Sequence, residues 1–82
     1  IGETATKLAK SNEDLLVIYL AAMTKYCLEN PEHSKDTRVV KRETIKSVIA
    51  YCKSQDIKMT GELKRLNVAL EKGELEKYLS LQ

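Results

Sequence analysis

Apolar residues fill the nine consecutive positions of Leu15–Met23 and leave almost no polar face. A helix that is apolar on every side is normally central and buried. Ser11 is a suitable N-cap, and the acidic residues that follow it favour the first turn of a helix. The residue before Pro31 avoids helical backbone angles, so the helix should end near Glu29. We therefore expect a helix from Ser11 to Glu29 that forms the hub of the fold.

The residues before Ser11 allow two interpretations. A seam with alternating steps of four and three runs from the first residue into the apolar stretch, as in a coiled coil. One continuous helix to Glu29, pairing with a copy of itself, would fit this seam. A separate short helix or a frayed arm that breaks at the Ser11 cap is the alternative, and the capping signal favours it. The seam consists of Ile1, Ala5, Leu8, Asn12, Leu15, Tyr19, Ala22 and Tyr26.

A second helix is expected over Thr37–Ser54. Its apolar face is given by the spacing i, i+3, i+4, i+7 of Ile45, Val48, Ile49 and Cys52. The two valines at 39 and 40 do not fall on this face, so the helix could begin anywhere from Thr37 to Glu43.

A third helix should begin after Thr60, which is a plausible cap. Leucines at positions 63, 66 and 70 make its apolar stripe, and Gly73 marks its end. Leu75, Tyr78 and Leu79 form a separate set about a third of a turn away from that stripe. A break at Gly73 would let both sets face one core.

Composition agrees with an all-α protein. Of 82 residues, 43% are hydrophobic and 32% charged, with no Phe or Trp, three glycines and one proline. The length fits a single domain, 1–82, in which residues 1–10 are a flexible or helical N-terminal arm. We expect a small up-down helical bundle of three main helices plus short terminal helical pieces. The absence of an initial methionine is consistent with a piece of a longer protein.

Candidate chemistry is sparse, and we expect no catalytic residue, no cofactor and no metal site. The single histidine, His33, lies in a charged loop, where a solvated role is expected. Cys27 and Cys52 form no CxxC motif, although a zinc site needs three or four ligands. The glycines at 2, 61 and 73 are isolated and make no phosphate-binding loop.

The two cysteines also bear on location. In antiparallel neighbouring helices they would lie roughly 20 Å apart, too far for a disulfide, which needs Cα atoms within about 7 Å. Free thiols fit a reducing compartment. With no signal peptide at its start and no run near the ~18 apolar residues of a membrane span, the chain is expected to be cytoplasmic.

Charge is concentrated in the middle of the chain. Residues 35–65 hold nine Lys or Arg and four acids, whereas residues 1–34 hold three and five, and residues 66–82 hold two and three. The middle segment therefore carries +5 and the flanks −2 and −1. We assign a candidate basic binding face to Arg38, Arg42, Lys46, Lys53, Lys64 and Arg65.

Two functions follow from these features. The favoured one is a non-enzymatic protein-interaction module (an adaptor, chaperone-like or regulatory protein) that binds a partner or itself through residual apolar surface beside a basic rim. The alternative is a small nucleic-acid-binding regulator in which residues 35–65 form a helix-turn-helix. The turn over residues 55–59 is long for that motif, and a pI near 8.6 is mild for a DNA-binding protein.

Overall fold

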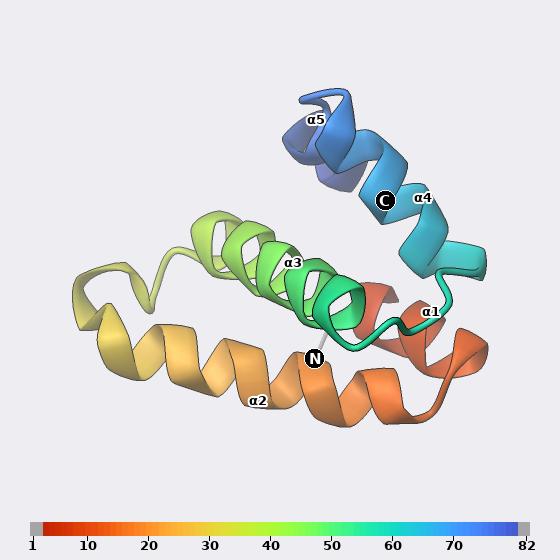
Figure 1. Cartoon of the computed structure of the whole chain (residues 1–82). Coiled ribbons are helices and arrows are strands. Elements are labelled where there is room, and N and C mark those ends of the chain that lie inside the picture. The colour runs from red at the N-terminus through yellow and green to blue at the C-terminus, as the bar shows by residue number, and fades with distance from the viewer. Residues whose placement is uncertain (1–2, 81–82) are drawn as a thin grey trace.

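The protein is an all-α bundle, as predicted (Figure 1). The computed structural model describes residues 3–80, apart from the side chain of Ser11. The helices are α1 (Glu3–Ser11), α2 (Asp14–Glu29), the short 3-10 helix η1 (Pro31–His33), α3 (Thr37–Ser54), α4 (Gly61–Glu71) and α5 (Leu75–Ser80).

A break separates α1 from α2, so the alternative of one continuous helix to Glu29 is wrong. Ser11 is not the N-cap of α2: that position is Glu13, whose side chain makes no capping hydrogen bond. Ser11 is the last residue of α1, and it is Asn12 whose side-chain Oδ1 accepts a hydrogen bond from the Asp14 amide at 3.0 Å. Of the proposed seam, Ala5, Leu8, Leu15 and Tyr19 are buried inside the chain itself, and Ile1 lies outside the described residues.

The expectation that the helix after Ser11 is the hub is wrong. In α2 only Leu15 and Tyr19 are buried, because α1 and α3 cover one side of the helix and its other side faces solvent. The central element is α3, which contacts α2, α4 and α5 and buries six side chains. Its one-sided apolar face is thus the main packing surface of the bundle.

Local chemistry sets most helix ends where the sequence predicts them. The predicted end of α2 at Glu29 is confirmed. The start of α3 is fixed at Thr37 because Asp36 Oδ1 accepts hydrogen bonds from the amides of Arg38 and Val39 at 3.2 and 3.3 Å. Val40 is buried on a regular helix, outside the main core cluster.

Gly73 ends α4 and redirects the chain, as predicted. Its φ is +71°, and the amides of Gly73 and Glu74 donate to the carbonyls of Leu70 (3.1 Å) and Ala69 (2.8 Å). This is the Schellman arrangement, in which a left-handed residue follows the helix. The turn brings Leu75 of α5 into the same core as the α4 leucines.

Candidate functional site

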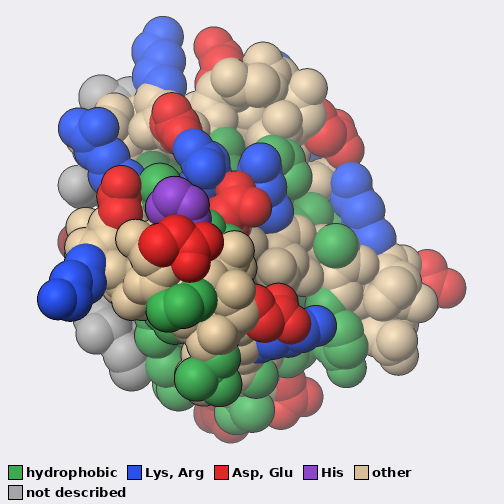
Figure 2. Space-filling view, turned by 90° about the vertical axis from the view of Figure 1, so that its left-hand side faces the viewer, with side chains coloured by type: hydrophobic (Ala, Val, Ile, Leu, Met, Phe, Trp, Pro, Cys, Tyr) green, Lys and Arg blue, Asp and Glu red, His purple; other side chains and the backbone are tan. Residues whose placement is uncertain are grey.

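The two most exposed large apolar side chains of the described chain lie on the outer side of α2. Val17 is 68% exposed and Leu28 is 77% exposed, and Ala21 and Thr24 between them are exposed as well. These four residues follow one another at steps of four, three and four, so they form one line along the helix. We call Val17, Ala21, Thr24 and Leu28 the outer row of α2. Figure 2 shows apolar side chains gathered along the lower edge of the molecule, where α2 lies.

Thr24 adds little polarity to the outer row. Its hydroxyl donates to the carbonyl of Leu20 one turn earlier, at 2.8 Å. The donor is therefore already used within α2. The half-buried Leu20 flanks the row and lines the same shallow groove. Between Val17 and Leu28 the row presents an apolar line with no charge on it.

A second groove lies between α2 and α3. It is lined from α2 by Val17, Ala21 and Tyr26 among others, and from α3 by Ser47 and Tyr51. Tyr51 is 46% exposed. Burial raises the pKa of Tyr26, and the nearby Glu43 carboxylate adds to the effect. The charged side chains shared by both grooves are Lys25 and Glu29.

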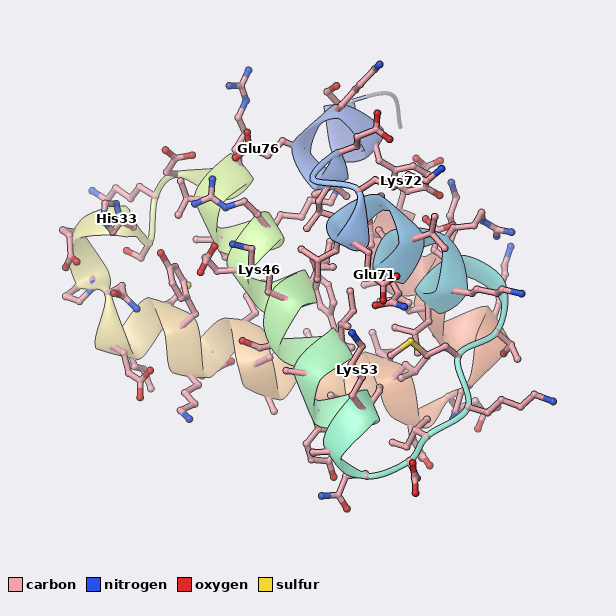
Figure 3. All side chains as sticks on the ribbon, turned by 45° about the horizontal axis from the view of Figure 1, so that its top comes forward. His33, Lys46, Lys53, Glu71, Lys72 and Glu76 are labelled. Atoms are coloured by element: carbon pink, nitrogen blue, oxygen red, sulfur yellow. The ribbon has the colours of Figure 1, made fainter. Side chains whose placement is uncertain are left out.

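The six predicted basic residues lie elsewhere, and none of them lines either groove. Arg42, Lys46 and Lys53 project from α3 on the side that faces α4 and α5, as Figure 3 shows for the two lysines. Arg38 is exposed at the start of α3, whereas Lys64 and Arg65 lie on α4. The apolar outer row and the basic residues are thus separate surfaces.

Carboxylates already neutralise four of the six. Arg42 pairs with Glu43 (3.0 Å) and also with Glu76 of α5, and Lys46 lies 3.4 Å from Glu43. Burial alone would raise the pKa of Glu43, but hydrogen bonds from Arg42 and Lys46 outweigh it and lower that pKa.

The remaining two pairs involve α4. Lys53 lies 3.6 Å from Glu71, and Arg65 Nε donates to Glu62 at 2.9 Å. Within the described residues, only Arg38 and Lys64 of the predicted set have no ion pair.

If α3 and α4 acted as a helix-turn-helix, α4 would have few free polar side chains with which to contact nucleic acid. The side of α4 that packs on the core carries Leu63, Leu66 and Ala69. Among the polar side chains of α4, Arg65 is paired with Glu62, and Asn67 Nδ2 donates to Glu71 at 3.3 Å. Only Lys64 remains exposed and without such a partner in the described chain.

A buried carboxylate that the sequence did not single out lies at the start of α4. Glu62 is 2% exposed and accepts hydrogen bonds from Arg65 Nε and from the Tyr78 hydroxyl, which lies 3.0 and 3.1 Å from its two oxygens. Burial, together with the hydrogen bond to Glu62, raises the pKa of Tyr78. The carboxylate joins α5 to the first turn of α4. Sequence spacing could not reveal this contact, because Tyr78 lies 16 residues from Glu62 along the chain.

The groups considered for chemistry are not assembled into a reactive set. His33 lies in the exposed η1 segment, 3.8 Å from Glu32. Cys27 and Cys52 are free, and burial raises the pKa of the Cys52 thiol. Across residues 3–80, no three His, Cys, Asp or Glu side chains come together in a way that could hold a metal ion.

Comparisons with known proteins add no functional assignment: no family model, no curated protein and no solved structure matches this chain. Among the helices that the structure describes, none has both the length and the apolar character needed to cross a membrane.

Proposed function

We propose that this domain is a non-enzymatic protein-interaction module that binds through the outer row of α2. The observation that carries the proposal is the exposure of Val17 and Leu28, 68% and 77%, on one line of a helix whose opposite side is packed in the bundle. Large apolar side chains placed singly on a surface are ordinary. Here Ala21, Thr24 and the half-buried Leu20 join the two into one uncharged stretch, and a contiguous apolar surface marks an interaction site. A partner helix laid along such a line would bury them at the usual three-to-four spacing.

The nucleic-acid alternative is the weaker proposal. Phosphate binding depends on cations that are free to replace counterions. Four of the six predicted cations are already paired with carboxylates of the same chain. A phosphate would have to displace those pairs, and the acids left behind would repel it.

A matched pair of variants tests the proposal. Val17→Glu places a charge in the outer row, and Val68→Glu makes the same change at a 40% exposed valine on α4. Each domain is immobilised and exposed to an extract of the source cells, and the bound proteins are identified. We expect the proteins recovered by the unchanged domain to be kept by Val68→Glu and lost by Val17→Glu. Equal recovery by all three would exclude the outer row as the binding surface.

A further inference from the structure

The exposed charges that border the outer row of α2 are mostly acidic. Glu13 and Asp14 lie one turn before the first residue of the row, and Glu29 directly follows the last. Lys25 is the base among these bordering charges. All four side chains are exposed, and none has an ion pair within residues 3–80. Acids therefore lie at both ends of the row and outnumber the bases there, although the whole chain carries a net charge of +2.

This excess of acids disfavours occupants that are themselves acidic. A second copy of the chain would bring the same excess to the contact, and like charges across an interface repel one another. Nucleic acid and anionic lipid surfaces attract basic residues, so acids at the border would repel both. A basic partner is favoured instead, because its Lys and Arg side chains complement Glu13 and Asp14 at one end of the row and Glu29 at the other.

The shape of the surface favours a helix as the occupant. From Val17 to Leu28 the row is about 16 Å long, or about three turns, and it lies on a helix whose backbone groups bond to one another. Among residues 3–80 no strand offers an edge to which an extended peptide could add. A partner helix satisfies its own backbone groups. Apolar side chains spaced four, three and four residues apart along it would face all four residues of the row, Leu28 included.

We propose that the partner of the outer row is an amphipathic helix of another protein, whose apolar stripe is flanked by Lys and Arg residues. This inference rests on the proposed function, since it names the chemistry of the partner at the same surface. The apolar side chains supply most of the affinity, and the acids that border the row select a basic partner. One such contact buries less than the about 1,200 Å² at the low end of specific interfaces, so the dissociation constant should be on the order of 100 µM.

Two synthetic peptides of about 18 residues test the choice of partner. Both carry Leu at the spacing i, i+4, i+7, i+11, and the flanking positions are Lys in one peptide and Glu in the other. Binding to the domain is measured by fluorescence anisotropy at about 0.1 M salt, with circular dichroism confirming that each variant of the domain is folded. We expect the Lys peptide to bind about tenfold more tightly than the Glu peptide, because several exposed charge pairs change sign between the two.

Variants of the domain locate the bound peptide. Leu28→Asn should weaken binding of the Lys peptide about tenfold, because it removes the most exposed apolar side chain of the row; Val68→Asn on α4 is the matched control and should have no effect. Asp14→Lys should weaken the same binding about threefold, and Lys25→Glu should tighten it about threefold. Glu3→Lys repeats the acid-to-lysine change in the first turn of α1 and should leave the dissociation constant unchanged.

The outcomes separate this inference from the proposed function. Equal affinity for the two peptides, no binding of the Lys peptide at about 1 mM, or binding that Leu28→Asn leaves unchanged overturns the basic helical partner, while the partner-capture experiment still decides the use of the outer row. Asp14→Lys and Lys25→Glu effects of the same sign, or no effect of either, overturn it as well. If the chain instead sediments as a dimer, or with phosphatidylserine vesicles, and Leu28→Asn abolishes this, the row binds a second copy or a membrane and the inference is wrong. Preference for the Lys peptide with opposite effects of the two charge changes supports it.

Discussion

Removing one hydroxyl should measure how strongly α5 is held to the bundle. The Tyr78→Phe substitution keeps the ring and deletes the group that donates to Glu62 at 3.0 and 3.1 Å. Glu62 is 2% exposed, so water cannot readily replace the lost donor. A hydrogen bond to a charged group is worth about 1.5–3 kcal/mol. Tyr78 itself is only half-buried, which places the expected loss near the lower end, about 1.5 kcal/mol.

The loss is measured by urea unfolding at neutral pH, as a lower midpoint at unchanged slope. For a domain of this size it corresponds to a fall of about 6–12 °C in Tm. Tyr51→Phe is the matched control, because Tyr51 is 46% exposed and its hydroxyl makes no hydrogen bond within the described chain. That control should stay within about 0.5 kcal/mol of the original. If the two variants were equally stable, the Tyr78–Glu62 hydrogen bond would contribute nothing and the reasoning would be refuted.

Three further predictions concern stability, each read from urea unfolding. The pKa of Tyr78 is raised above its ordinary value near 10, so the stabilisation that its hydroxyl provides is complete below pH 10 and lost as pH rises through the raised value. The difference in unfolding free energy between the original chain and Tyr78→Phe should therefore be constant from pH 7 to 9 and change above pH 10. Thr44→Val should stabilise by about 1 kcal/mol, because the Thr44 hydroxyl is buried without a hydrogen-bond partner; a loss of stability would contradict this. At two of the left-handed positions, Gly73→Ala should cost about 1 kcal/mol and Asp56→Gly should gain about 0.5 kcal/mol. Effects of the same sign at both positions would contradict the backbone argument.

Helix ends were predictable because their causes are local. Pro31 ends α2 through a steric clash with the residue before it, and Gly73 ends α4 by taking a positive φ. Where two neighbouring residues can both cap, the choice depends on the geometry of the corner. Ser11 and Asn12 both qualify by residue type, yet the N-cap position is Glu13, and Asn12 only accepts a hydrogen bond from the Asp14 amide just before the helix. Glycine is not required at every such helix end, because Asp56 takes φ +55° just after α3.

Burial of α2 could not be predicted because it depends on how many neighbours the helix has. An all-apolar helix indicates a central position only if other helices are available to surround it. Here α4 packs on α1 and α3, α5 packs on α3 and α4, and α2 is left with α1 and α3 on one side. The prediction of residual apolar surface therefore rested on the wrong assumption that α2 is the central helix. The exposed surface exists because α2 lies at the edge, and not because a central helix is incompletely covered.

The ion pairs within the candidate basic face could not be predicted for a related reason. The sequence places Arg42 and Lys53 near one another on one helix, but it does not reveal that Glu76 and Glu71 face them from α5 and α4. These partners are 34 and 18 residues away along the chain, beyond any local spacing rule. Charge counted by segment is thus a poor guide to charge available at a surface when the acids of one segment fold onto the bases of another.

The separation of the two surfaces gives them different responses to salt. If phosphate binding were confined to the free cations Arg38 and Lys64, a log–log salt dependence with a slope of only about −2 would follow. Association through the apolar outer row of α2 would change little with salt, because burial of apolar surface does not depend on the screening of charges. Its affinity would come from Val17, Leu28 and their neighbours in the row. The basic segment 35–65 thus forms ion pairs within the bundle. The apolar helix α2, which the sequence suggested would be central and buried, carries the exposed apolar surface.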